Sequence, residues 1–443
     1  MEQKLEAHMK QAGVVIAGGG LAGLSAACYL ARAGIEVTVF ERSAKPGGRA
    51  TSQIHDGYTF NLGIHALYTG GPASEVLQEL GIPYSGHSPK DIYVLRKGKL
   101  SIAPVNALTM LRTDALSFAD KLELMSLFAR IARLKPEELR TISVQEWIEH
   151  NIRRPQVREL MTANAYTFVY SSALEQVSAD VFIKKMQISL KNPVLYIDGG
   201  WQTLVDGLRK AAEQAGAHIV TGTRVESVIQ EHSQVVGVRL RDGEVVSASA
   251  VILATSPHDA VKLVDGGNYQ PLREMVESFV PARVACLDVA LSRLPNPRYP
   301  LVQDLEAPRF LSTQSVYADI APRGGALIHT FKQLDPFHLN KPGEDERDLE
   351  NLLDTVQPGW RDVLIKRVYL PHIEAVGMLP TISNGGYAGR PGLQVPGLSN
   401  LYVIGDWVGE GFLSDPSFGS ARQVAQLLSR KSKASGSPIA AGI

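Results

Sequence analysis

Four residues in the first part of the chain have the types and the spacing needed to bind a dinucleotide. Gly18, Gly20 and Gly23 form the pattern G-x-G-x-x-G, and Glu41 follows 18 positions after the last of them. In such a site the first glycine makes a tight turn, the second lets backbone N–H groups approach a pyrophosphate, and the third lets a helix pack closely on a strand. The acidic residue accepts hydrogen bonds from the adenosine ribose. We therefore expect a pyrophosphate on the glycines and a ribose on Glu41.

The neighbouring sequence predicts the elements that position these residues. Residues 14–17, VVIA, are a short β-branched run typical of a buried strand. Residues 24–34, LSAACYLARAG, have the small side chains of a helix packed on a sheet, and Gly34 ends it. Residues 35–40, IEVTVF, form a second strand that leads to Glu41. A strand, a glycine turn, a helix, a strand and an acid in this order predict a βαβ unit.

The same stretch, residues 14–34, has no charged side chain before Arg32, as a membrane span or a secretory signal would. Its three consecutive glycines interrupt the run near the start, and its β-branched beginning suits a strand. Residues 1–10 mix two Glu with two Lys, whereas a signal peptide begins with a purely positive region. The nucleotide-binding interpretation is therefore preferred over a span or a signal.

The composition of the whole chain is that of an ordinary folded protein. Its 443 residues are 44% hydrophobic and 20% charged, with 45 basic and 45 acidic side chains, a balance that gives no bulk attraction to nucleic acid. Cys28 and Cys286 lie in apolar contexts and are expected to be packed thiols. The sequence has no C-x-x-C, H-E-x-x-H or P-loop pattern. We expect no metal and a cytoplasmic protein.

We expect an α/β fold in which a Rossmann-type nucleotide-binding domain is interrupted by two inserts. Residues 106–190 have helical periodicity, including a capping box at Ser117 and Asp120. A hairpin is expected to turn at residues 242–243, and residues 266–385 are expected to be mostly strands. The expected division is residues 12–85, 191–265 and 386–431 for the three parts of the nucleotide-binding domain, 86–190 for a helical substrate or lid insert, 266–385 for a strand-rich substrate domain, and 432–443 for a disordered tail.

Several short blocks along the chain, taken together, resemble a known superfamily. They are the first βαβ unit, "GGRATS", "LGIH", "RVESV", "VILATSP" and "YVIGDW". Their order is similar to that of the flavin-containing amine oxidase, phytoene desaturase and protoporphyrinogen oxidase superfamily, and most similar to its bacterial phytoene-desaturase-like FAD-dependent oxidoreductases. The resemblance implies a glutathione-reductase-like FAD-binding domain with an inserted substrate domain of strands and a helical subdomain. It implies FAD rather than NAD, held without a covalent bond, because the cysteine that carries the flavin in some relatives is absent.

The resemblance also implies roles for individual residues. The pyrophosphate would lie on the first glycine turn, the ribose on Glu41, the adenine against the backbone of Val225, and the ribityl chain or pyrophosphate against Asp406. A helix N-terminus at residues 419–421 would face the pyrimidine end of the flavin, where its partial positive charge stabilises the negative charge of the reduced ring. The residues implied to hold FAD are Gly18, Gly20, Leu21, Ala22, Gly23, Glu41, Arg42, Gly48, Arg49, Gly63, Ile64, His65, Val225, Gly405, Asp406, Phe418, Gly419 and Ser420.

His65 is the one candidate for a catalytic role, because the resemblance places it beside the flavin ring, where it would orient the ring or transfer a proton. The chain departs from the amine oxidases at the substrate end. Ser417 stands where one of their two cage aromatics is expected, and "AVGMLPTIS" contains no aromatic residue for the other. Asn61 replaces the aspartate common in the "LG" loop. These departures weaken the amine oxidase interpretation.

The leading hypothesis is an FAD-dependent oxidoreductase that removes a hydride from a mostly apolar small molecule, such as a polyene or an isoprenoid. The alternatives are an amine oxidase that produces an imine, a redox-neutral flavoenzyme such as an isomerase, and a non-enzymatic lipid-binding escort protein. Oxygen and a quinone are both open as electron acceptors. The basic stretches 151–160 and 182–187 are interpreted as solvated helix faces, with peripheral membrane contact as the alternative.

Overall fold

The computed structural model describes residues 12–434, and its first unit is the predicted βαβ arrangement. Strand β1 (Ala12–Ala17) leads through the glycines into helix α1 (Leu21–Arg32), and strand β2 (Val37–Glu41) follows. The two strands are parallel, with Ile16 opposite Val39. The apolar stretch at residues 14–34 is therefore a strand, a turn and a helix. Within residues 12–434, no helix is long and apolar enough to cross a membrane.

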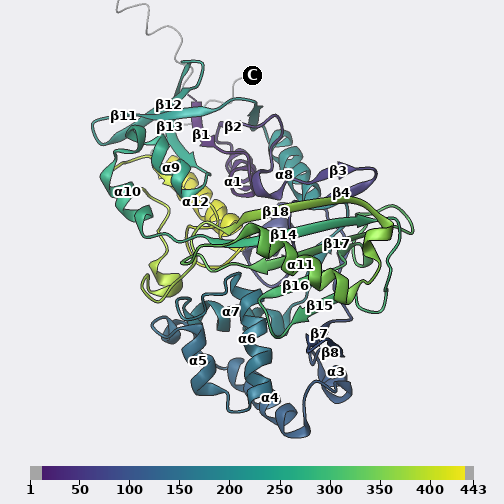
Figure 1. Cartoon of the computed structure of the whole chain (residues 1–443). Helices are drawn as coiled ribbons and strands as arrows, with labels where there is room; N and C mark the ends of the chain where they lie inside the picture. The colour runs from purple at the N-terminus through teal and green to yellow at the C-terminus, as the bar shows by residue number, and fades with distance from the viewer. Residues whose placement is uncertain (1–11, 435–443) are drawn as a thin grey trace, which may run out of the picture.

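Strand β1 lies in the middle of the first sheet (Figure 1). Its order is β10-β2-β1-β13-β12-β11, and β19 pairs with β13. Strand β13 serves two partners: its first half pairs antiparallel with β12, and its second half runs parallel to β1 and β19. The predicted hairpin turn at Asp242–Gly243 joins β12 to β13, and Gly243 has φ +93° there. The added strands are β10 (His218–Thr221), β11 (Val225–Glu231), β12 (Gln234–Leu240), β13 (Val245–Leu253) and β19 (Leu401–Val403).

This sheet is buried on both faces, because alternate side chains of its central strands belong to different cores. Val14 and Ile16 pack among the helices on one face, whereas Val15 and Ala17 pack under the β11–β12 hairpin on the other. Alternation of this kind follows from the period of two in a strand. The helices on the first face, besides α1, are α2 (Pro72–Glu79), α8 (Gln202–Gln214) and α12 (Asp415–Ala434), and those on the second are α9 (Pro257–Leu263) and α10 (Gln270–Glu277).

A second sheet of seven strands has the order β18-β14-β17-β16-β15-β7-β8. The hairpin β7–β8 lies far upstream of the others in sequence, yet β7 pairs parallel with β15. Helix α11 (Pro342–Val356) covers one face through Leu349, Leu352, Leu353 and Val356; it is an exception to the predicted strands of residues 266–385. The strands are β7 (Tyr93–Arg96), β8 (Lys99–Ile102), β14 (Ala282–Leu291), β15 (Leu301–Asp304), β16 (Arg309–Ser312), β17 (Ala326–Gln333) and β18 (Leu364–Val376).

A group of helices covers the other face of the second sheet and forms the lower end of the molecule in Figure 1. The predicted helical character of residues 106–190 is confirmed. Ser117 and Asp120 form the predicted capping box, and Ser143 accepts a hydrogen bond from the backbone of Glu146. The helices are α3 (Ala107–Arg112), α4 (Phe118–Ile131), α5 (Val144–Asn151), α6 (Pro155–Val169) and α7 (Ala179–Lys191).

Five short strands connect these layers, and α12 completes the described chain. Helix α12 continues to Ala434, so residues 432–434 of the expected disordered tail are helical, and the rest of that tail lies outside the described residues. Cys28 and Cys286 are buried free thiols, as predicted. The short strands are β3 (Gln53–His55), β4 (Tyr58–Phe60), β5 (Leu67–Tyr68), β6 (Gly86–His87) and β9 (Val194–Ile197).

Candidate functional site

A cavity of about 480 Å³ lies at the carboxyl ends of β1, β2 and β13. Its walls include Ala17, Glu41 and Ala254, which end or directly follow these three strands. Ligands of open α/β sheets bind at this edge, because the loops that leave the strands there diverge and open a crevice. Segments from both halves of the chain meet in the cavity, since Gly405 and Asp406 follow β19 and also line it.

The glycine turn is shaped for close approach of a ligand. Gly18 has φ +113°, and a Cβ there would lie 2.5 Å from the carbonyl oxygen of Ala254. A Cβ on Gly23 would lie 2.0 Å from the carbonyl oxygen of Gly18, so only glycine lets α1 approach the turn. A Cβ on Gly20 would meet only the carbonyl oxygen of Gly47, at 4.0 Å. Gly20 precedes α1, whose start has no side-chain cap and no acidic residue. The free N–H groups of this first turn fit a phosphate.

Glu41 is held in the cavity wall by two backbone amides. Its Oε2 accepts a hydrogen bond from the N–H of Gly19, and its Oε1 accepts one from the N–H of Ser43, both at 2.8 Å. Each carboxylate oxygen keeps a second lone pair. The arrangement therefore fixes the carboxylate and leaves two acceptor positions for the hydroxyls of a ribose.

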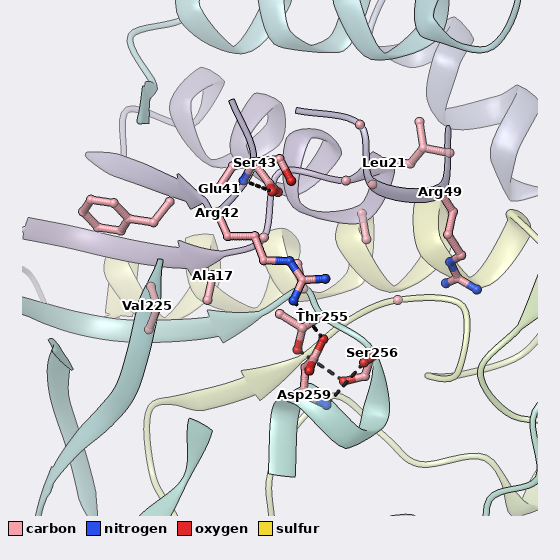
Figure 2. Close-up of a pocket in the computed structure, with 18 of the residues that line it drawn as sticks. Ala17, Leu21, Glu41, Arg42, Ser43, Arg49, Val225, Thr255, Ser256 and Asp259 are labelled. Atoms are coloured by element: carbon pink, nitrogen blue, oxygen red, sulfur yellow. Dashed lines mark hydrogen bonds and ion pairs between the residues drawn. The ribbon is translucent and has the colours of Figure 1, made fainter. Parts of the chain in front are cut away.

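Arg42 and Val225 line one end of the cavity, as Figure 2 shows. The guanidinium of Arg42 points toward helix α9 and lies 3.6 Å from the carboxylate of Asp259. Ser256 caps that helix by accepting a hydrogen bond from the N–H of Asp259. Because the side chain of Arg42 is 63% exposed, this ion pair is weak and can yield to a ligand.

Arg49 lies apart from Arg42, beside Asp406. Its guanidinium donates two hydrogen bonds to the carboxylate of Asp406, at 2.9 and 2.5 Å, and the N–H of Gly377 donates a third at 2.7 Å. Burial by itself would raise the pKa of Asp406, but the charge and hydrogen bonds of Arg49 outweigh it and lower that pKa. The neighbouring Glu374 also lines the cavity, and burial raises its pKa. This end therefore holds a charged, fixed carboxylate.

The loop that carries His65 lies behind Arg49, and Gly63, Ile64 and His65 are not among the cavity walls. The ring Nδ1 of His65 lies 3.1 Å from the carbonyl oxygen of Gly63, and its Nε2 lies 3.2 Å from that of Arg49. Burial lowers the pKa of His65, so the ring is neutral at pH 7. A neutral imidazole has one N–H and can donate to only one of two carbonyls at a time. The second carbonyl oxygen therefore becomes a hydrogen-bond acceptor for the ring only when the imidazole takes up a second proton.

Helix α12 begins at Asp415, four residues earlier than predicted, because Asp415 and Pro416 both suit the first turn of a helix. Ser417 of this turn lines the cavity. Phe418, Gly419 and Ser420 lie outside its walls: Phe418 is fully buried in the core beneath α1, Gly419 packs toward Pro72, and Ser420 accepts a hydrogen bond from the N–H of Gly405 at 3.1 Å. These residues brace the cavity rather than line it.

Among the predicted residues, the cavity brings together Gly18, Gly20, Leu21, Ala22, Glu41, Arg42, Gly48, Arg49, Val225, Gly405 and Asp406. Gly23 lies one turn behind it. The cavity has both polar and apolar walls, a free helix N-terminus on one side, and an acceptor pair for a ribose. These features fit a dinucleotide such as FAD. Within residues 12–434, no group of three or more His, Cys, Asp or Glu is arranged to hold a metal ion.

Comparison with known proteins decides the family. The sequence model described as "Flavin containing amine oxidoreductase" matches residues 21–290, more than half of the chain. The chain belongs to this family. The predicted resemblance is thereby confirmed, and the mixed α/β fold with it. The family is one of flavin-dependent oxidoreductases, so FAD is the cofactor and the expectation of an oxidoreductase is confirmed at that level.

Curated relatives and solved structures give the same picture at greater distance. Two proteins named 4,4'-diaponeurosporene oxygenase, from two strains of Staphylococcus aureus, are 25% and 26% identical over 311 and 349 residues. These matches span 61% and 69% of this chain, and 61% and 66% of the relatives, so the chain covers less than two thirds of their length. Two solved structures share the fold. An oxidoreductase from Methanosarcina mazei has a TM-score of 0.76 and 20% identity, over 94% of this chain and 100% of that one. Cyclohexylamine oxidase from Brevibacterium oxydans IH-35A has a TM-score of 0.71 and 18% identity, over 96% of this chain and 100% of that one.

Sequence reasoning missed a buried pair beneath the His65 loop of this flavoprotein. Asp288 on β14 and His329 on β17 lie directly opposite each other, with 2.9 Å between Oδ1 and Nδ1, and neither side chain is exposed. The other oxygen of Asp288 accepts a hydrogen bond from the N–H of Gly63 at 3.2 Å. A signal was present, because "ACLDVAL" and "ALIH" each place an Asp or a His after a run of mostly apolar strand residues.

Lys185 on α7 is a second missed group. Its Nζ lies 3.3 Å from the centroid of the Tyr68 ring and has no hydrogen-bond acceptor within the described chain. Burial lowers the pKa of Lys185 to about 8, although the charge of Asp415 opposes the shift. The lysine belongs to "FIKKMQ", which was interpreted as a solvated basic face. That interpretation is wrong for Lys185, which is buried, whereas Lys184 is exposed.

Proposed function

We propose that the protein is an FAD-dependent oxidoreductase that removes a hydride from a mostly apolar small molecule, a polyene or an isoprenoid in its chemistry. The observation that carries this proposal is Ser417. It lines the flavin cavity at the position where the amine oxidases of the family are expected to present an aromatic side chain. The names of the curated relatives, which refer to the polyene diaponeurosporene, support the same substrate class.

The cavity supports a specific placement of FAD. The pyrophosphate would lie on the turn from Gly18 to Ala22 and the ribose on Glu41, with Arg42 and Val225 toward the adenine. The ribityl chain would meet the pair formed by Arg49 and Asp406. Attachment is non-covalent in this proposal, since both cysteines lie in cores away from the cavity walls. When bound, FAD supplies a two-electron acceptor for a hydride.

The division of the chain follows from the two sheets. The parallel sheet and its helices would bind FAD through residues 12–85, 191–265 and 386–431. The second sheet and the helices α3–α7 would hold the substrate. Because the hairpin β7–β8 pairs with β15, the segments 86–190 and 266–385 would form one substrate region rather than two independent inserts.

The substrate region has the environment that removal of a hydride from a C–H bond needs. The layer between the second sheet and the helices is apolar and aromatic, with Tyr170 stacked on Phe331 at 5.7 Å and Phe310 beside it at 5.4 Å. Around a substrate that enters it, such a layer would exclude water and fix the substrate's orientation, which matters more here than a strong base. His65 would orient the reacting groups or hold a proton through its two carbonyl contacts.

The test is anaerobic reduction of the bound flavin, followed through its visible absorbance. The holoenzyme is mixed with a detergent-dispersed apolar polyene, and in parallel with putrescine and cyclohexylamine. We expect bleaching by the polyene alone, and readmission of oxygen or addition of a quinone then identifies the acceptor. Bleaching by an amine alone would replace the proposal with an amine oxidase. A flavin that stays oxidised with every reductant would favour redox-neutral chemistry, and a protein that binds no added FAD would favour a lipid-binding escort protein.

A further inference from the structure

Six of the fourteen large hydrophobic side chains that are exposed in the described chain lie in one short segment. Within residues 105–125, six large hydrophobic side chains are between 48% and 78% exposed. Scattered exposed hydrophobics are ordinary, but a contiguous group marks a surface that contacts something. The six are Val105, Leu108, Leu111, Phe118, Leu122 and Met125, and we call them the α3–α4 patch.

Helix α4 carries two separate apolar stripes. Leu124, Leu127 and Ile131 face the core and are fully buried. Phe118, Leu122 and Met125 recur at intervals of four and three, which places them on one face of a helix. This second stripe is exposed although the core needs only the first. An additional apolar face of this kind needs an apolar environment of its own.

The patch is held in place by hydrogen bonds and does not depend on a ligand to form. The ammonium of Lys121 donates to the carbonyl oxygen of Leu111 at 3.1 Å, which ties α4 to the end of α3. Both helices begin with a capping box, at Asn106 and Ser117. Figure 1 shows α3 and α4 at the lower end of the molecule, away from β1 and β2 at the flavin cavity.

The charges around the patch are predominantly positive. Residues 97–135 contain seven Lys and Arg but three Asp and Glu, and all three acids already have partners. Asp114 pairs with Lys99 at 2.6 Å, buried Asp120 pairs with Arg154, and Glu123 accepts hydrogen bonds from the N–H groups of residues 153 and 154. Exposed cations that have no carboxylate within the described chain include Arg112, Arg130 and Arg133.

We propose that the α3–α4 patch docks onto the surface of an anionic lipid bilayer. The six apolar side chains would enter the boundary between headgroups and acyl chains, and the surrounding cations would meet lipid phosphates. A protein partner with an apolar groove would cover the stripe, but the excess of cations over acids in residues 97–135 matches a phosphate surface. The basic stretches 151–160 and 182–187, considered from sequence, are not this surface. The docking face would bring the substrate region against the phase in which an apolar substrate dissolves.

The experiment is flotation of the full-length holoprotein with lipid vesicles. Vesicles of phosphatidylcholine with phosphatidylglycerol are compared with vesicles of phosphatidylcholine alone. We expect the wild type to float with the mixed vesicles and several-fold less with the neutral ones. The triple variant Phe118→Ser/Leu122→Ser/Met125→Ser should lose at least about tenfold in partition, since apolar area and charge together set the affinity. Arg112→Glu/Arg130→Glu should lose only the preference for anionic lipid.

A matched control removes three exposed apolar side chains elsewhere, Phe337→Ser/Leu339→Ser/Ile365→Ser, and should float like the wild type. The flavin absorbance of every variant reports whether it is folded. Absence of wild-type flotation with both vesicles, or equal loss in the control, would overturn the proposal. A wild-type dimer that the α3–α4 variant converts to a monomer would assign the patch to a second copy instead. Flotation does not depend on turnover, so the substrate proposal and this one can fail separately.

Discussion

Substitution of Glu41 by glutamine should weaken FAD binding by an amount that follows from the hydrogen bonds of this side chain. The carboxylate accepts from Gly19 and Ser43 and keeps two acceptor positions. Glutamine has one carbonyl oxygen, and its NH₂ group would face a backbone N–H, so one backbone donor and at least one ribose hydroxyl lose their acceptor. A hydrogen bond to a charged group contributes about 1.5–3 kcal/mol, which corresponds to roughly 10- to 150-fold in the dissociation constant.

The assay is titration of apoprotein with FAD, followed by quenching of flavin fluorescence. Glu226→Gln is the matched control, because Glu226 also lines the cavity but no backbone amide within residues 12–434 holds its carboxylate. We expect the control to bind FAD like the wild type. Equal dissociation constants for Glu41→Gln and the wild type would refute the assignment of the ribose to Glu41. Equal losses in both variants would show that the overall negative charge, and not the hydrogen bonds, determines the affinity.

Three further outcomes are expected, each measured by urea unfolding of the apoprotein at a series of pH values. The pKa of Asp406 is lowered in the folded state, so its ion pair with Arg49 stabilises the protein above the unfolded pKa, and this stabilisation is lost as the pH falls through the folded pKa. Arg49→Leu should therefore reduce the free energy of unfolding by about 1–3 kcal/mol at pH 7, and by less in acid. A difference that does not change with pH would contradict this. The pKa of Lys185 is lowered to about 8, so the buried ammonium destabilises the fold below pH 8. Lys185→Met should raise the free energy of unfolding by about 3 kcal/mol at pH 7, and this gain should decline from pH 8 upward. A loss of stability in the variant would mean that the ammonium has a favourable partner. Asp288→Ala removes the acceptor of the Gly63 N–H and should cost about 1–3 kcal/mol, whereas an unchanged value would show that water replaces the carboxylate.

The first βαβ unit could be predicted from sequence because its determinants are local. A β-branched run, three glycines and a helix of small residues fix β1, α1 and β2 within a few residues. The capping box at Ser117 was predictable for the same reason, since its two partners are three residues apart. Helix α11 could also have been found, because Leu349, Leu352, Leu353 and Val356 repeat at helical spacing. Its start, with a proline and two acidic residues in the first turn, is also typical of a helix.

The rest of the site could not be predicted because its contacts join distant segments. Arg49 and Asp406 are 357 positions apart, and the pair depends on β19 taking its place beside β13. Glu374 reaches the cavity wall from the last part of β18, where no local pattern distinguishes it. The His65 loop is irregular, so neither period of two nor period of 3.6 fixes its direction. Its position depends on Asp288, which lies more than 200 residues further along the chain.

The position of β1 has a consequence for how the protein is made. Strand β1 lies between β2 and β13, and β13 in turn needs β19, whose residues follow β1 by almost the whole length of the chain. During synthesis β1 and β2 therefore leave the ribosome long before β13, the other neighbour of β1, exists. Contacts of such high sequence separation form slowly and leave strand edges exposed in the meantime. In the proposed site, FAD would not be held by Glu41 and Asp406 together until residues 401–406 have emerged, so the proposal makes cofactor loading a late step in the synthesis of this part of the chain.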